Sequence, residues 1–312
     1  MTPLLDAVRR HADACADRHG LASTPIPGLT TVRAAAPSGL VHAIARPLVC
    51  LVLQGSKAVS MGPARFSFSA GDLLLISADV PTVSQITAAS RVAPYYSLVL
   101  ELDPAVIAGL AVRMGPPVPE PAGSAVRLDP TAAEVADAAL RLMRLLDRPE
   151  AAPLLQKPLL TEIHYWLLAG RHGAAIRRLG WPDGPAQRIA RAVALLRSDY
   201  AQPLPTARLA AAAGMSLSAF HAHFRAVTSL TPLQFQKQLR LIEARRLMQA
   251  EGAGASQAAF AVGYESVPQF TREYGRLFGQ PPVRDARQAR EAARREPTGC
   301  GETKPIGSRT LA

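Results

Sequence analysis

The spacing of apolar residues changes several times along the chain. From Leu4 to Ala12 they recur at helical intervals, so residues 1–19 are expected to form a helix. Between residues 25 and 115, short runs rich in Val, Leu, Ile, Phe and Ser are separated by turn signals such as Ala70-Gly71-Asp72. Strands of this length and spacing predict a small antiparallel barrel or sandwich.

The pattern becomes helical again from about residue 129. Asp129 precedes Pro130, the order expected of a helix N-cap followed by proline at the first helical position. Apolar faces from Leu140 to Leu146 and from Leu154 to Leu168 predict two helices, the second ending at Gly170. Residues 180–184, GWPDG, have the composition of a linker.

Residues 185–285 contain an internal repeat with a period of about 50 residues. Each copy has a small residue, then a glycine, then two aromatic residues four positions apart, and then a proline. The glycines, Gly214 and Gly263, allow the positive φ that a tight turn between two helices needs. Aromatic residues four apart lie on one face of the second helix and anchor it to a core.

Serines stand at the start of the second helix of each copy. Ser216 and Ser266 are predicted N-caps, and Ser266 with Gln269 has the spacing of a capping box. Between the copies, residues 231–249 predict an amphipathic helix about 28 Å long. Helix-turn-helix units in successive major grooves lie about 34 Å apart, so this helix suits two such units on one DNA duplex.

Charge favours the same interpretation. The chain has a net charge of +11, and residues 185–285 hold 12 Lys and Arg against six Asp and Glu. A basic surface alone is weak evidence for a nucleic-acid partner, and helical bundles without such a partner also contain helix-turn-helix shapes. The repeat, the polar outer faces and the local charge together favour DNA. Residues 286–312 are basic, have little to bury and are expected to be disordered.

The remaining composition indicates a cytoplasmic protein. The apolar runs, such as Leu48 to Leu53, are too short to span a membrane, and the N-terminal residues lack the apolar core of a secretory signal. The cysteines, Cys15, Cys50 and Cys300, are too few and too widely spaced for a disulfide framework or a zinc site.

The repeat resembles the DNA-binding domain of the AraC/XylS family of transcriptional regulators. The stretches GMSLSAFHAHFRAVTSLTPLQFQKQLRLIEARRLM and AAFAVGYESVPQFTREYGRLFGQPPVRD carry this resemblance. LVCLVLQGSKAVSMG, AGDLLLISADVPT, PYYSLVLELD and TEIHYWLLAGRHGAAIRRLG resemble the N-terminal domain of one branch of that family, a cupin-like β-barrel followed by helices.

The resemblance implies an α+β fold. The expected domains are a cupin-like β-barrel effector or regulatory domain at 1–128, a helical dimerisation or signal-transmitting region at 129–179, a linker at 180–184, a double helix-turn-helix domain at 185–285 and a basic tail at 286–312.

The family motif also implies which residues contact DNA. In the first recognition helix Ser218, His221 and Ala222 are expected to face base edges, and Ala222 replaces an arginine common in the family. The expected contacts of the second recognition helix are Gln269, Thr271 and Arg272, while Arg225 and Arg276 are expected to face phosphate. Arg272 is the candidate for guanine readout, because its planar fork matches O6 and N7.

The front half shows no pattern of catalytic residues. No histidine occurs between Leu48 and Leu102, so the His-x-His pair of a metal-binding cupin is missing, and neither a metal nor a cofactor is expected. Three hypotheses remain: a regulator that responds to a small-molecule effector bound in the barrel, a constitutive DNA binder whose barrel only dimerises, and, least favoured, a cupin-like enzyme.

The first hypothesis implies several partners. These are promoter DNA, an unidentified effector, a second copy of the chain in a homodimer, and RNA polymerase if the protein is an activator. Cys50, in an apolar strand, is expected to be an inert core residue, with an effector or redox site as the alternative.

Overall fold

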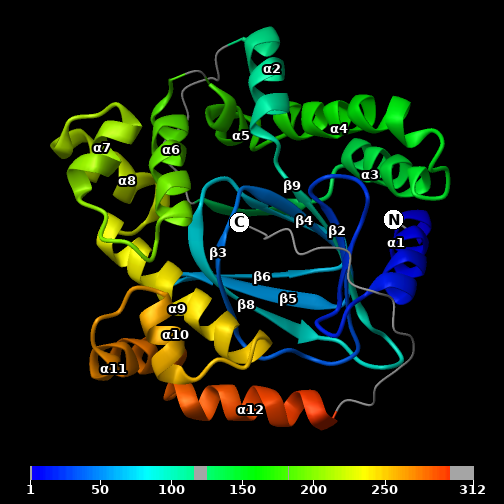
Figure 1. Cartoon of the computed structure of the whole chain (residues 1–312). Coiled ribbons are helices and arrows are strands. Elements are labelled where there is room, and N and C mark those ends of the chain that lie inside the picture. Colours follow the sequence, from blue (N-terminus) through cyan, green and yellow to red (C-terminus); the bar gives the residue numbers. More distant parts are fainter. Residues whose placement is uncertain (1, 116–124, 182, 296–312) are drawn as a thin grey trace. The chain divides into compact units, whose positions relative to one another are not determined.

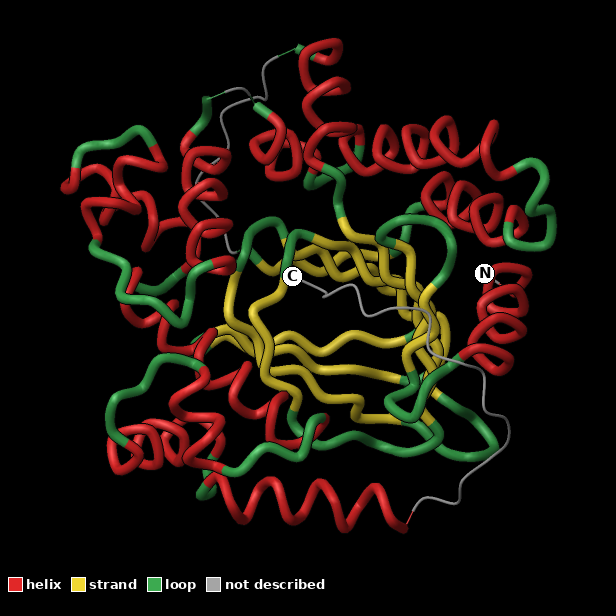
Figure 2. Tube along the Cα trace, viewed as in Figure 1, coloured by secondary structure: helices red, strands yellow, loops and turns green. Residues whose placement is uncertain are grey.

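The computed structural model describes residues 2–115, 125–181 and 183–295 (Figures 1 and 2). The chain divides into two compact units, each described here by itself. One comprises Met1–Ala190 with His223–Ser229, and the other comprises Arg191–Ala222 with Leu230–Ala312. Among the described residues, no helix is long and apolar enough to cross a membrane.

The strands of the first unit form two antiparallel sheets, seen in Figure 2. The six-stranded sheet has the order β1 (Leu21–Ser23), β2 (Leu29–Ala34), β9 (Tyr95–Glu101), β4 (Leu48–Gln54), β7 (Asp72–Ile76) and β10 (Val126–Pro130). The four-stranded sheet has the order β3 (Val41–Ala45), β8 (Val80–Ala88), β5 (Ser56–Met61) and β6 (Ala64–Ser69).

The predicted barrel or sandwich takes the form of two sheets and is not closed into a barrel among the described strands. No strand pairing among the described residues joins one sheet to the other. The chain passes between them at Gly55, whose φ is +79° and whose added Cβ would lie 2.4 Å from the Ala88 carbonyl oxygen. Only glycine accepts this turn without strain. Val52, Phe68 and Tyr95 belong to one buried cluster that draws side chains from both sheets.

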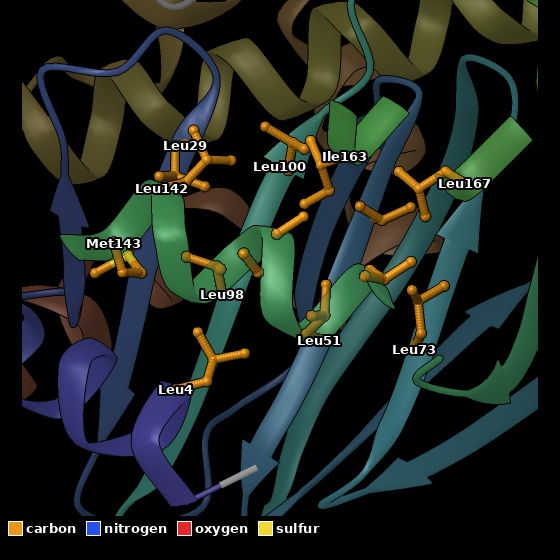
Figure 3. Packing of buried hydrophobic residues seen from close by; sticks show 14 of the residues in the cluster. Leu4, Leu29, Leu51, Leu73, Leu98, Leu100, Leu142, Met143, Ile163 and Leu167 are labelled. Atoms are coloured by element: carbon orange, nitrogen blue, oxygen red, sulfur yellow. The ribbon is translucent and has the colours of Figure 1, made fainter. Parts of the chain in front are cut away.

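Helices cover the other face of the six-stranded sheet (Figures 1 and 3). They are α1 (Thr2–Cys15), α3 (Ala133–Leu145) and α4 (Ala152–Ala169). Because side chains alternate along β4, Leu51 points to these helices and Val52 points to the other sheet. Leu51 packs in the same apolar core as Leu142 and Ile163. Two shorter helices, α2 (Pro104–Met114) and α5 (Gly173–Gly180), pack on each other beside this core.

Two expectations for this unit are wrong. Asp129 and Pro130 are the last residues of β10 rather than the start of a helix, and α3 begins at Ala133 without a side-chain cap. Strand pairing of Pro130 with Asp72 extends β10 through the proline, which can occupy an edge strand. The helix α2, capped by Asp103, falls within residues 25–115, which were expected to form strands.

From residue 185 to residue 295 the only regular secondary structure is helical. The helices are α6 (Pro185–Ser198), α7 (Thr206–Ala213), α8 (Leu217–Thr228), α9 (Pro232–Ala250), α10 (Ala255–Ala261), α11 (Val267–Phe278) and α12 (Pro282–Arg295). The connecting helix α9 confirms the prediction within one residue and begins with a capping box made by Thr231 and Gln234. Disorder from residue 286 is wrong for residues 286–295, which lie in α12, and residues 296–312 are outside the described part.

Candidate nucleic-acid interface

Two helix-turn-helix motifs are present, α7 with α8 and α10 with α11. Glycine lies in each turn with a positive φ, +61° at Gly214 and +86° at Gly263. At Gly263 a second constraint applies, because an added Cβ would lie 2.0 Å from the carbonyl oxygen of Ala201. An added Cβ at Gly214 would meet nothing closer than 3.9 Å. The two turns share a conformation, but only the second is also closely packed.

Aromatic residues fix the buried face of each second helix. Phe220 and Phe224 in α8 are fully buried, as are Phe270 and Tyr274 in α11. This confirms the prediction that residues four apart anchor each helix to a core. The opposite face of each helix is therefore turned away from that core.

The serines cap their helices as local sequence predicts, with one difference. Ser266 Oγ accepts from the Gln269 backbone N–H at 3.4 Å, and Ser216 Oγ accepts from that of Ala219 at 3.3 Å. The side chain of Gln269 does not complete a capping box. Its Nε2 instead donates to Glu273 Oε1 at 3.2 Å.

The residues expected to contact DNA lie on the faces away from the cores. In α8 all of them are exposed: Ser218, His221, Ala222 and Arg225. In α11 the exposed ones are Gln269, Arg272 and Arg276, whereas Thr271 is half-buried. Within the described part of the chain, no ion pair engages Arg225, Arg272 or Arg276. These guanidinium groups are therefore available to an anionic partner.

A carboxylate missed by sequence analysis links α11 to α9. Glu273 accepts from Lys237 Nζ at 2.7 Å, from the Tyr264 hydroxyl at 2.8 Å and from Gln269 Nε2. Burial alone would raise the pKa of Glu273, but the hydrogen bonds from Lys237 and Tyr264 outweigh it, so the pKa is lowered. Burial raises the pKa of Tyr264, and its hydrogen bond to Glu273 adds to the effect. Gln269 is thus positioned by an ionised carboxylate.

Arg240, in the middle of α9, joins segments that flank both motifs. Its Nε donates to the Tyr200 carbonyl at 2.7 Å, and its Nη1 donates to the Gly263 carbonyl at 2.9 Å. Its Nη2 donates to the carbonyls of Ala201 at 3.1 Å and Gln202 at 3.2 Å. One side chain therefore holds the segment before α7 against the turn of the second motif.

A second carboxylate, that of the buried Asp285, fixes the C-terminal side of α11. Asp285 is 3% exposed and accepts from Arg245 Nε at 2.8 Å, Arg245 Nη2 at 3.0 Å, Gln280 Nε2 at 2.7 Å and the Tyr274 hydroxyl at 2.5 Å. Burial would raise the pKa of Asp285, but these hydrogen bonds lower it overall. The recognition helix α11 is thus tied to α9 and α12 by ionic hydrogen bonds as well as by apolar contacts.

The described residues of the first unit form no cluster typical of metal catalysis. The described residues include no group of three or more His, Cys, Asp or Glu side chains able to hold a metal ion. Cys50 is 2% exposed and lies in the buried cluster between the sheets. The Tyr95 hydroxyl is close to it, and burial, together with Cys50, raises the pKa of Tyr95. Cys50 therefore lies in packed surroundings, as expected of a core thiol.

This chain carries two helix-turn-helix motifs, and the second helix of each has an exposed polar face. This arrangement is typical of double helix-turn-helix DNA-binding proteins. Residues 209–288 match the model of a helix-turn-helix domain, and residues 25–175 match that of the AraC-type transcriptional regulator N-terminus. The chain belongs to the AraC/XylS family of transcriptional regulators.

Two curated relatives each match less than half of the chain. The HTH-type transcriptional activator RhaS of Escherichia fergusonii is 29% identical over 106 residues, 34% of this chain and 38% of RhaS. A probable thc operon regulatory protein of Rhodococcus erythropolis is 31% identical over 153 residues, 47% of this chain and 46% of that protein. The chain thus spans less than half the length of these relatives.

The fold as a whole resembles ToxT of Vibrio cholerae. A crystal structure of ToxT with a bound unsaturated fatty acid superposes with a TM-score of 0.54 and covers 83% of this chain and 93% of ToxT. Sequence identity is 10%, so the likeness concerns the fold. It supports the α+β arrangement of a β-rich N-terminal domain and a helical C-terminal domain.

Proposed function

We propose that this protein is a sequence-specific DNA-binding transcriptional regulator. One observation carries the proposal: both α8 and α11 bury an aromatic pair on one face and expose the expected contact residues, apart from the half-buried Thr271, on the other. A recognition helix needs this division, since one face must stay in the protein core while the other enters the major groove.

The two motifs are proposed to recognise DNA in different ways. Arg272 reads guanine through O6 and N7, aided by Gln269 and Thr271. In α8 the small Ala222 suits contact with a thymine methyl group, with Ser218 and His221 beside it. Phosphate contacts come from Arg225 and Arg276, which set register and orientation rather than base preference.

The first unit is proposed to regulate DNA binding rather than to catalyse a reaction. A small-molecule effector, a homodimer through the helical region and a cytoplasmic location are part of this proposal. If the protein activates transcription, as the name of RhaS states for that relative, RNA polymerase is a further partner. A constitutive DNA binder whose first unit only dimerises is the alternative, and an effector that changes promoter affinity separates the two.

Binding-site selection and salt titration test the proposal. The full-length protein should select related sequences from a random DNA pool, with affinity falling steeply as salt rises because several phosphate contacts release counterions. Arg272→Ala should relax the preference at one base pair and cost about 1–3 kcal/mol. Arg276→Ala is the matched control and should weaken all sequences alike with a smaller salt slope.

Two results would contradict this proposal in whole or in part. Folded protein that retards no promoter DNA at low salt contradicts the function itself. Identical selected sites for the wild type and for Arg272→Ala would remove Arg272 from the recognition set and leave the rest of the proposal in place.

A further inference from the structure

The side-chain amide of Gln269 is held in one orientation at the start of α11. Gln269 is exposed and lies in the first turn of the helix, after the cap Ser266. Its Nε2 donates to Glu273 Oε1 at 3.2 Å, one turn further along the same face. Because a carboxylate oxygen only accepts hydrogen bonds, the NH2 end of the amide must face Glu273. The carbonyl oxygen of Gln269, Oε1, therefore points away from Glu273.

The carboxylate that orients this amide is itself fixed. Lys237 Nζ donates to Glu273 Oε1 at 2.7 Å, and the Tyr264 hydroxyl donates to Oε2 at 2.8 Å. The Glu273 side chain is only 18% exposed. Hydrogen bonds to an ionised acceptor are stronger than those between neutral groups. Glu273 is therefore a fixed partner that only accepts, and it selects one of the two possible orientations of the Gln269 amide.

One acceptor and one donor of Gln269 remain for a partner outside the protein. Within the described part of the chain nothing donates to Gln269 Oε1, and one of the two Nε2 hydrogens is unused. The first turn of a recognition helix is also the part that contacts base edges in the major groove. A base that matches Gln269 must therefore offer one donor beside one acceptor.

From this geometry we propose that Gln269 reads adenine in a base pair neighbouring the one contacted by Arg272. Adenine N6–H donates to Oε1, and N7 accepts from the unused Nε2–H. Guanine presents two acceptors, O6 and N7, so one of them would face the carbonyl oxygen. Cytosine offers a donor without the neighbouring acceptor, and thymine offers an acceptor beside a methyl group. The inference rests on the proposed function and gives Gln269 a base of its own.

The spacing along α11 suits two neighbouring base pairs. Gln269 and Arg272 are three residues apart on the exposed face of the helix. This spacing is about 4.5 Å along the helix axis, compared with about 3.4 Å between successive base pairs.

Glu273 acts as a positioning residue and not as a base contact. A glutamate can read cytosine by accepting from N4, but both oxygens of Glu273 already accept hydrogen bonds from protein donors. Its negative charge is also paired with Lys237, which reduces repulsion from the phosphates.

The first motif has no equivalent pair. In the repeat Phe220 corresponds to Phe270, so Ala219 and His223 occupy the positions of Gln269 and Glu273. Alanine has no amide to present to a base. The adenine preference is therefore expected only in the half of the DNA site bound by α11.

Affinity measurements with single base-pair changes test the inference. Each base pair of a selected site is replaced in turn by the other three, and fluorescence anisotropy gives the affinity of the full-length protein. The position at which Gln269→Ala no longer distinguishes the four bases is the one that Gln269 reads. There the wild type should bind adenine about tenfold more tightly than guanine, with cytosine between them.

Glu273→Met should reduce this adenine-to-guanine ratio to less than about threefold, because the amide of Gln269 is then free to turn its NH2 group toward guanine. Glu273→Gln is the matched control, since it removes the same charge but keeps an acceptor. Lys237 only donates, so the oxygen of the new amide turns toward it and still accepts from Gln269. This variant should keep most of the adenine preference.

The ratio separates positioning from a general structural effect. Any change in charge or in the packing of α11 on α9 alters the affinity for all four bases alike and cancels in the ratio. Thermal unfolding followed by circular dichroism checks that the variants are folded. Gln269→Ala changes an exposed side chain and should melt near the wild type, so it decides the base identity even if Glu273→Met does not fold.

Four results overturn the inference: no position at which Gln269→Ala alters base preference; a preference for guanine or thymine at that position; an undiminished ratio in folded Glu273→Met; or a ratio lost as completely in Glu273→Gln as in Glu273→Met. Failure of the proposed function is distinguishable from all four, because the wild type would then select no related sequences from the random pool.

Discussion

Replacing Arg240 should loosen the connection between the two helix-turn-helix motifs. Arg240→Ala removes four hydrogen bonds to the carbonyls of residues 200–202 and Gly263. Hydrogen bonds from a charged donor are worth about 1.5–3 kcal/mol each. These carbonyls are incompletely buried and regain water, so the net loss should be about 3 kcal/mol rather than the sum. For a unit of about 100 residues this corresponds to a melting temperature lower by about 12–24 °C.

The loss of DNA affinity in Arg240→Ala should be larger for a complete site than for a site with only one intact half. Fluorescence anisotropy, measured below the melting temperature of the variant, can compare a selected site with the same site scrambled in one half. The wild type should strongly prefer the complete site, because Arg240 holds the two motifs in a fixed arrangement. Arg240→Ala should lose much of this preference while keeping affinity for the remaining half. Arg240→Lys should fall between them, since one ammonium cannot reproduce the planar fork.

Arg246→Ala is the control on the same helix. Arg246 is a surface residue that pairs with Glu243 and Glu251, and its side chain is 51% exposed. Exposed ion pairs contribute about 0–1 kcal/mol, so this variant should melt and bind DNA nearly like the wild type. If Arg240→Ala keeps both the wild-type melting temperature and the preference for the complete site, the proposed role of Arg240 is refuted.

Three further sets of substitutions test the buried contacts and the turns that stabilise each unit. Asp285→Asn should lower the free energy of unfolding by about 3 kcal/mol at neutral pH. Because the pKa of Asp285 is lowered in the folded protein, the carboxylate contributes its full stability above the ordinary value of 3.8 and loses it as pH falls through the lower folded pKa. Chemical denaturation at a series of pH values should therefore show a flatter acid dependence in the variant. Gly263→Ala should destabilise by about 3 kcal/mol and Gly214→Ala by only about 1 kcal/mol, as both have positive φ but only the former meets a carbonyl oxygen at 2.0 Å; equal losses would contradict this. Cys50→Ser should cost about 1 kcal/mol, since the Tyr95 hydroxyl can partner the new one, and an unchanged melting temperature with a lost effector response would instead make Cys50 the sensor.

Local sequence signals predicted the DNA-binding helices well because their causes are local. The spacing of the aromatic residues in α8 and α11 follows from the period of one helix, and it identified their buried faces. The glycine at each turn follows from backbone conformation alone, and both Gly214 and Gly263 have the expected positive φ. The same periodicity placed α9 within one residue of its observed bounds.

The errors arose where distant segments decide the structure. Asp129 and Pro130 have the local order of a helix start, but pairing of β10 with β7 draws them into the sheet. Residues 48–53 of β4 are all apolar, so the sequence shows neither which of them face the helices nor whether the sheets close into a barrel. The sequence predicts that the DNA-binding domain ends at Asp285, but Asp285 lies in the first turn of α12 and is bound by side chains from α9 and α11.

The residues missed by sequence analysis share one physical feature, which also bears on how this protein recognises DNA. Arg240, Glu273 and Asp285 are polar groups whose partners lie up to 40 residues away, so no periodicity marks them. They hold backbone and helices in place, while Arg272 and Ala222 stand on exposed faces outside these networks. Under the proposed function, substitution of an exposed residue should therefore change base preference at little cost in stability, whereas substitution of Arg240, Glu273 or Asp285 should change how the two motifs are held relative to each other.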